Sequence, residues 1–192
     1  WLVEVRNDHW TLIGLGSHGE PLTTRAVAPL EPAGPRPALP VPIHARDERV
    51  HIGLGTRLVI YSMATREPEI VDVGEVITSL SGSAPGTRAR LAVTFEQGGI
   101  LYWENFYHSG LGETFASGMV NPVAGFTGGG DLVAAGESGC EVYSTQDRHV
   151  RLKAELIGLR ARPLAVLPLP RPDQFALFFV DGELAVYQVS AG

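Results

Sequence analysis

The chain has 192 residues, of which 44% are hydrophobic and 19% are charged, and its formal net charge is −6 at pH 7. This length allows one large core, or a row of repeats that share one, and the composition excludes wholesale disorder. The arginines are scattered and Cys140 is the single cysteine, so we expect no nucleic-acid partner, no internal disulfide and no cysteine-based metal cage.

A complete G-x-G-x-x-G pattern, Gly14 to Gly19, lies at the end of the first apolar stretch, 2–14. In a dinucleotide-binding turn the last glycine packs against a helix whose N-terminus holds the pyrophosphate. Here Pro21 interrupts the pattern and a proline-rich insert follows at 29–42, so no such helix is expected. We therefore interpret 2–14 as a hairpin that turns at Asn7-Asp8, and we predict no cofactor.

Four later segments share one pattern, in which an apolar strand, a glycine-containing turn and a second apolar strand end in an aromatic residue. The segments span 49–63, 90–105, 131–145 and 175–189. Their aromatic residues, here called the anchors, are Tyr61, Trp103, Tyr143 and Tyr187, at spacings of 42, 40 and 44 residues. Such a fixed period indicates a repeat architecture, and we expect the anchors to pack between the repeated units.

One strand-like segment precedes each of these hairpins and another follows each of the first three, which is typical of a β-propeller blade of four strands. We therefore predict an all-β fold, with a single β-propeller domain of four-stranded antiparallel blades over 1–192. The predicted blades are 1–28, 40–74, 76–118, 122–156 and 163–190. The segment 150–159 also has the length of a short helix, but the repeat favours a strand.

This count gives about four to five blades, since the first blade has no inner strand and the last has no outer one. Propellers contain roughly four to eight blades. We therefore expect this chain to form part of a larger ring that is completed by sequence outside it.

The hairpin at 131–145 resembles the core of a WD repeat, in which the third strand of a blade ends in an apolar, an aromatic and a polar residue. The chain resembles a degenerate member of this propeller family at four such endings. They are Tyr61-Ser62, Trp103-Glu104, Tyr143-Ser144 and Tyr187-Gln188. No Gly-His dipeptide opens the blades, so the resemblance extends equally to propellers outside the WD family.

The resemblance implies a binding face formed by the hairpin turns and by the connections between blades, because binding residues concentrate on loops of a rigid scaffold. A second candidate patch is the aromatic cluster at 102–108, which suits either packing at a blade corner or stacking on a sugar or peptide. The predicted partner-binding residues are Arg57, Glu96, Trp103, Tyr107, His108, Arg160, Arg162 and Asp181.

The histidines have no metal-ligand spacing and no G-x-S-x-G motif occurs, so we predict no metal site and no catalytic residue. His51 is expected to be a structural histidine of its strand. Four carboxylates precede strands in a pattern typical of turn residues, although they are also the candidates for an active site at the channel mouth. They are Asp47, Glu48, Asp131 and Asp173.

We therefore predict a non-enzymatic module that serves as a scaffold or recognition surface for another protein, or for a domain of the same polypeptide. A propeller-type hydrolase or lyase is one alternative, and a carbohydrate-binding, lectin-like propeller is another. No signal peptide and no apolar run of about 20 residues is present, so we expect a cytoplasmic protein without membrane contact.

Overall fold

Strands alone make up the regular structure that the computed structural model describes. The described residues are 2–6, 9–15, 21–27, 41–46, 49–62, 68–83, 88–105, 112–145 and 149–189, with side chains from residue 41 onward. Within these ranges no helix has the length and apolarity needed to cross a bilayer.

The strands form five antiparallel sheets, each a meander of strands consecutive in the sequence. The first sheet contains β1 (Leu2–Arg6), β2 (His9–Leu15) and β3 (Pro21–Val27). The second contains β4 (Ile43–Arg46), β5 (Arg49–Leu54), β6 (Arg57–Ser62) and β7 (Pro68–Asp72). The third contains β8 (Ile77–Gly82), β9 (Leu91–Phe95), β10 (Gly99–Trp103) and β11 (Glu113–Ala116). The fourth contains β12 (Val123–Phe126), β13 (Leu132–Gly136), β14 (Gly139–Ser144) and β15 (Arg151–Ile157), and the fifth contains β16 (Pro163–Pro168), β17 (Gln174–Phe179) and β18 (Leu184–Gln188).

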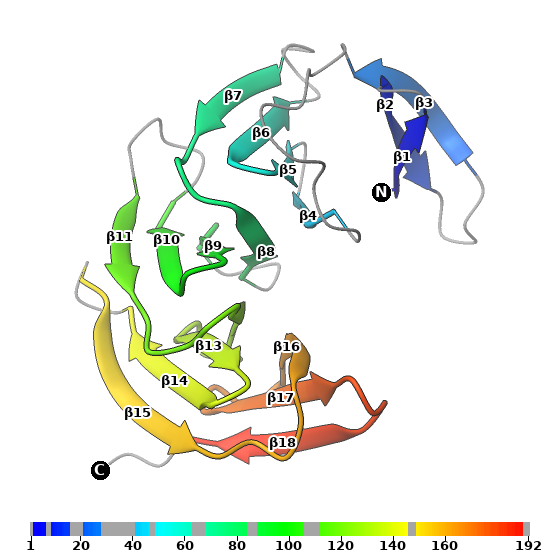
Figure 1. The fold of residues 1–192 in the computed structure, drawn as a ribbon. Coiled ribbons are helices and arrows are strands. Elements are labelled where there is room, and N and C mark those ends of the chain that lie inside the picture. Colours follow the sequence, from blue (N-terminus) through cyan, green and yellow to red (C-terminus); the bar gives the residue numbers. More distant parts are fainter. Residues whose placement is uncertain are drawn as a thin grey trace.

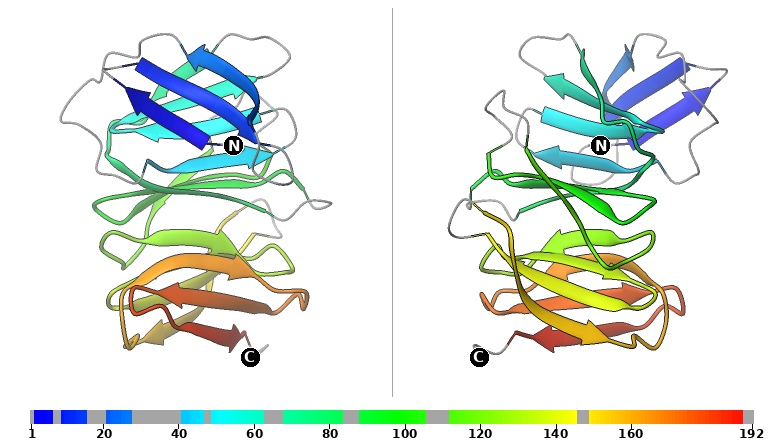
Figure 2. Two further views of the ribbon diagram at one scale, coloured as in Figure 1. Left: turned by 90° about the vertical axis from the view of Figure 1, so that its right-hand side faces the viewer. Right: turned by 60° about the vertical axis from the view of Figure 1, so that its left-hand side comes forward.

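The sheets follow one another along an arc in chain order, with the first and last strand of each sheet at its inner and outer side (Figure 1). Turned by 90°, the same sheets stand as a stack of layers (Figure 2). The predicted all-β fold of antiparallel blades is confirmed. The helix considered for 150–159 is wrong, because this segment is β15.

Tight turns close the hairpins where the sequence places glycine. Gly55, Gly98 and Gly182 have φ angles of 60°, 90° and 83°, which side-chain-bearing residues rarely adopt. After β2 the chain continues into the strand β3, where a dinucleotide-binding turn requires a helix.

The inner strands β8 and β12 are joined by hydroxyl groups rather than by large side chains. Thr94 Oγ1 donates a hydrogen bond to the Pro122 carbonyl (2.8 Å) and lies 2.6 Å from Ser79 Oγ. Ser79 Oγ in turn accepts from the Ala124 N–H (3.2 Å). Small polar side chains of the third sheet thus pack between the two inner strands and satisfy backbone groups at the start of the fourth sheet.

Apolar clusters fill the seams between neighbouring sheets, and the anchors lie in them. Trp103 packs with Leu58 of the second sheet, and Tyr143 packs with Ile100 of the third sheet. Tyr187 is half-buried against the cluster that unites the fourth and fifth sheets. Each of these three anchors therefore faces the sheet that precedes its own, as a wedge between blades.

Gly125 of β12 marks the closest approach of two inner strands. A Cβ atom built on Gly125 would lie 2.6 Å from the Val166 Cβ and 2.7 Å from the Val166 carbonyl oxygen of β16. We predict that Gly125→Ala lowers the free energy of unfolding by about 1–3 kcal/mol, the usual cost of overpacking a core. Urea denaturation measures the change, with Ser138→Ala in an exposed turn as the control that leaves it within about 0.5 kcal/mol. Equal urea midpoints for Gly125→Ala and the wild type would contradict the close packing of these strands.

Candidate functional site

One edge of the stacked sheets is built from two kinds of loop, which together are called the turn face. The hairpin turns span 55–56, 96–98, 137–138 and 180–183, and the connections between sheets span 73–76, 117–122 and 158–162. Each connection folds back over the hairpin turn of the sheet that it leaves. The backbone hydrogen bonds that hold it there run from Val73 N to Thr56 O (2.8 Å), from Ser117 N to Gly98 O (2.9 Å) and from Gly158 N to Ser138 O (2.9 Å).

Connections 73–76 and 158–162 are also bonded to the hairpin turn of the sheet that they enter, since Glu96 N donates to Val76 O (3.0 Å) and Val180 N donates to Arg162 O (3.1 Å). The far ends of connections 73–76 and 117–122 are bonded back to the hairpin turn of the sheet that they leave. Ile77 N donates to Gly55 O (2.8 Å), and Asn121 N donates to Glu96 O (3.2 Å). One residue of each connection reverses the chain with a positive φ angle. These residues are Gly74 (77°), Asn121 (48°) and Gly158 (77°). The turn face is therefore a continuous backbone network, and its loops are held in place before any partner binds.

A buried carboxylate that the sequence analysis did not single out also supports the turn face. Both carboxylate oxygens of Glu141 in β14 accept hydrogen bonds from Gly118 N, each at 3.1 Å. Glu141 also accepts from the Tyr143 hydroxyl at 2.5 Å, and this bond, together with burial as the larger cause, raises the pKa of Tyr143. The only signal in the sequence is a charged residue inside the apolar stretch Gly139–Ser144.

Five of the predicted partner-binding residues lie on the turn face or, for Arg57, at the first position of β6 directly after it, and they carry both signs of charge. They are Arg57, Glu96, Arg160, Arg162 and Asp181. Glu96 and Arg162 are exposed. Arg160 pairs with Glu183 and lies 4.9 Å above the centre of the Phe179 ring. Asp181 accepts a hydrogen bond from the Glu183 N–H (3.1 Å).

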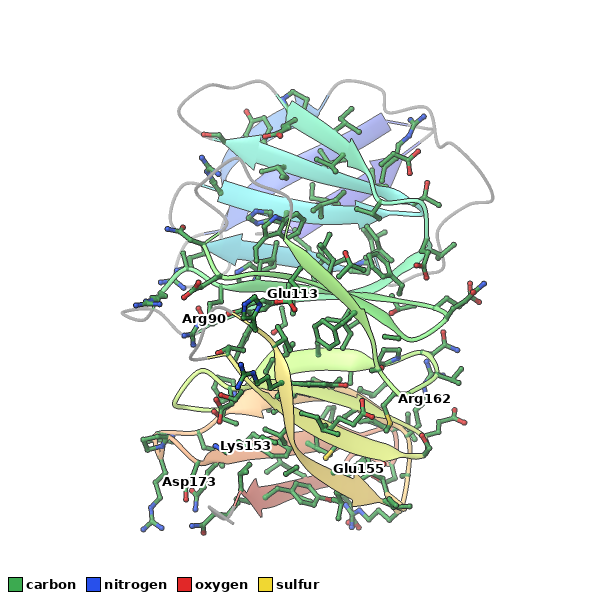
Figure 3. The ribbon with its side chains drawn as sticks, turned by 90° about the vertical axis from the view of Figure 1, so that its left-hand side faces the viewer. Arg90, Glu113, Lys153, Glu155, Arg162 and Asp173 are labelled. Atoms are coloured by element: carbon green, nitrogen blue, oxygen red, sulfur yellow. The ribbon has the colours of Figure 1, made fainter. Side chains whose placement is uncertain are left out.

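The other three predicted residues do not belong to this edge. Figure 3 places Arg162 at one side of the stack, and Arg90 and Asp173 at the opposite side. Trp103 is the last residue of β10 and pairs across the sheet with Leu91, the residue directly after Arg90. Its side chain is only 9% exposed because the indole packs in the seam with the second sheet. Tyr107 and His108 lie outside the described residues. The structure thus groups the charged candidates and separates them from Trp103.

The carboxylates proposed for catalysis are engaged in local bonds where the structure describes them. Asp131 is buried and bonds the Lys153 ammonium at 2.7 Å. Asp173 accepts from the Gln188 side-chain amide at 2.7 Å. Asp47 and Glu48 lie outside the described residues. Among the residues that are described, no group of three or more His, Cys, Asp or Glu side chains is placed to hold a metal ion.

A half-buried and a fully buried histidine form a pair on neighbouring strands. His44 of β4 and His51 of β5 are direct cross-strand partners with stacked rings 6.1 Å apart. Burial, helped by the Arg46 guanidinium, lowers the pKa of His44 to about 4. Burial, with His44 and Arg49 as lesser causes, lowers the pKa of His51 to about 3. The prediction of a structural role for His51 fits a fully buried, neutral ring.

The sequence matches no protein-family model, and no curated protein matches it. Solved structures do match. One is a crystal structure of BBS1N in complex with ARL6DN, soaked with lead, with a TM-score of 0.63 and 14% sequence identity. The match covers 97% of this chain and 60% of that chain, so these residues span about three fifths of the similar protein. The fold is a β-propeller. At this level of identity the propeller likeness concerns the fold alone, without evidence for the WD family.

The histidine pair gives the propeller a pH-dependent stability with a definite sign. Above pH 6.5 both rings are neutral in the folded and the unfolded chain. Below pH 6.5 only the unfolded chain takes up these protons, until the pH approaches the lowered pKa values of about 4 and about 3. We predict that each histidine then removes up to about 1.4 kcal/mol of folding free energy per pH unit.

Urea denaturation between pH 6.5 and 5, above the range where ordinary carboxylates titrate, measures this slope. The free energy of unfolding of His44→Gln should fall less steeply with decreasing pH than that of the wild type, and the difference should equal the contribution of one histidine. NMR titration of the imidazole signals is the second measurement, and both rings should stay neutral at pH 5. Protonation of either ring near pH 6.5 in the folded protein would refute the prediction.

Proposed function

We propose that this propeller is a non-enzymatic interaction module, which binds another protein or a domain of its own polypeptide through the turn face. The observation that carries the proposal is the exposed, mixed-charge set of side chains on a backbone network that is already fixed. The similar structure supports it at the level of the fold, since BBS1N is seen there in complex with ARL6DN.

The turn face suits protein recognition for two physical reasons. Loops that are hydrogen-bonded in advance lose little conformational freedom on binding, which lowers the cost of association. Charges of both signs at the rim of an interface steer the partner and select its orientation, while contributing modestly to affinity. The module would therefore act as a rigid platform whose specificity lies in the pattern of charges.

The described contacts weigh against the alternatives. Asp131 and Asp173 hold strand ends through Lys153 and Gln188, which supports structural roles rather than a hydrolase or lyase site. Tyr102 and Trp103 are buried in seams, so their rings are not open to a sugar. Membership of the WD family and a cytoplasmic location remain predictions from the sequence.

The proposal is tested by reversing charges on the turn face without changing the net charge. The double variant Glu96→Arg with Arg162→Glu should weaken binding of a captured partner by about tenfold, because two exposed charges at an interface become repulsive. The matched control is Glu155→Arg with Arg151→Glu, on the exposed outer strand β15. Partners captured by the wild-type propeller are identified, and their dissociation constants are measured for all three proteins at low and physiological salt. A partner that loses affinity equally with the control pair, or not at all with the turn-face pair, would place the binding surface elsewhere.

A further inference from the structure

The loops of the turn face expose aliphatic side chains to solvent. Val76 in connection 73–76 is 37% exposed, and Val120 in connection 117–122 is 67% exposed. Ile157, directly before connection 158–162, is 78% exposed, and Val180 in the hairpin turn of the fifth sheet is 54% exposed. These four residues are here called the aliphatic row. Each connection between sheets therefore has an exposed valine or isoleucine within it or directly before it.

The opposite edge of the stack offers a comparison on the same scaffold. Its described loops include 88–90, 104–105, 127–131 and 169–173, and in these loops no valine, leucine, isoleucine or phenylalanine is exposed. Single exposed apolar residues are ordinary on a protein surface, whereas a set that gathers on the loops of one edge is typical of an interaction surface. The aliphatic row therefore distinguishes the turn face from the loops at the other edge.

Backbone hydrogen bonds place the first two members of the row beside the same hairpin turn. Glu96 N donates to Val76 O at 3.0 Å, and Asn121 N donates to Glu96 O at 3.2 Å. Val120 directly precedes Asn121 in the chain. Residue 96 thus lies between Val76 and Val120, with an exposed carboxylate at that position.

The row continues over the hairpin of the fourth sheet and onto the fifth. The Val120 carbonyl oxygen lies 3.1 Å from the position that a Cβ atom on Gly136 would take. Ile157 pairs with Gly139, at the other end of the same hairpin turn. Val180 N donates at 3.1 Å to the last residue of the connection that follows Ile157. The four residues therefore follow one another along the turn face, from the third sheet to the fifth.

Carboxylates alternate with this row. The hairpin turns and connections of the turn face contain five acidic and two basic residues, and all seven are exposed. They are Glu75, Glu96, Glu137, Asp181 and Glu183, with Arg160 and Arg162. Since Arg160 pairs with Glu183, four other carboxylates stand beside Arg162. The aliphatic row therefore lies in a negative field.

We propose that the partner of the turn face presents a basic amphipathic segment, in which an apolar stripe is flanked by lysine or arginine. The proposal rests on the proposed role of the turn face as the binding surface, and it adds the chemistry of the partner. The apolar stripe covers the aliphatic row, and the flanking cations lie against Glu75, Glu96 and Glu137. Charge complementarity favours this occupant over a second copy of the chain, because two copies of this face would set carboxylates against carboxylates.

The two parts of this surface contribute differently to binding. Valine and isoleucine are stiff at χ1, and the loops that carry them are already hydrogen-bonded, so little conformational freedom is lost when a partner covers them. An apolar centre with a polar rim is the usual anatomy of a protein interface. The aliphatic row therefore supplies affinity, while the carboxylates speed the encounter and fix the orientation of the partner.

The test uses two synthetic helical peptides as probes, and fluorescence anisotropy measures their dissociation constants. One peptide has leucine along one face and lysine elsewhere, and the other has glutamate in place of lysine. The variant Val120→Thr with Val180→Thr keeps the β-branched shape and replaces one methyl group by a hydroxyl at each position. The matched control is Ile70→Thr with Val186→Thr, at exposed positions of β7 and β18. All four positions are exposed, so the urea midpoints of both variants should equal that of the wild type.

The lysine peptide should bind the wild type about tenfold more tightly than the glutamate peptide, most clearly at low salt. Its dissociation constant should rise about tenfold for Val120→Thr with Val180→Thr, and stay within about twofold for the control. Equal binding of the two peptides, or equal losses for the two variants, would overturn the proposal. A dimer of the protein alone that the Val120→Thr with Val180→Thr variant dissociates would identify a second copy as the occupant, and would also overturn it.

Partners captured by the wild type separate this proposal from the proposed function. A captured partner that loses affinity when the charges of Glu96 and Arg162 are reversed, but binds Val120→Thr with Val180→Thr as it binds the wild type, would overturn only the amphipathic partner. A captured partner that both variants bind as tightly as the wild type does would overturn the turn face as the binding surface, and this inference with it.

Discussion

The structure depends on burying both faces of narrow sheets against their neighbours. A sheet of three or four short strands with two apolar faces must cover both faces to be stable in water, so much of its contribution to folding comes from its seams. In such an array the stability is approximately a sum of terms for the sheets and for the contacts between neighbours. Loss of one seam therefore exposes two apolar faces at once.

Several polar groups in these seams join one sheet to the next. Thr94 and Ser79 connect β8 and β9 to the start of β12, and Glu141 connects β14 to the connection at 117–122. An unpartnered carboxylate or hydroxyl in these positions would cost more than it contributes. The same bonds fix the loops of the turn face. Sheet packing and the geometry of the binding surface are thus linked by the same side chains.

The repeat predicted the fold because its signals are local. Glycine at a hairpin turn and an aromatic residue at the end of the next strand act within about 15 residues, and all four later hairpins carry them. The sequence also indicated correctly which loops lie together, since an alternating antiparallel meander puts hairpin turns and connections at one edge. It placed the anchors, Trp103 included, between the repeated units, but it did not indicate that His44 and His51 stack or that Glu141 holds Gly118. Those contacts depend on how one sheet is placed on the next, and no local period encodes that placement.

The anchors give the row of sheets a direction. Trp103, Tyr143 and Tyr187 each point back toward the preceding sheet, whereas the opposite faces present mainly smaller side chains, such as those of Leu58, Val142 and Cys140. The two faces of a sheet are therefore complementary rather than alike.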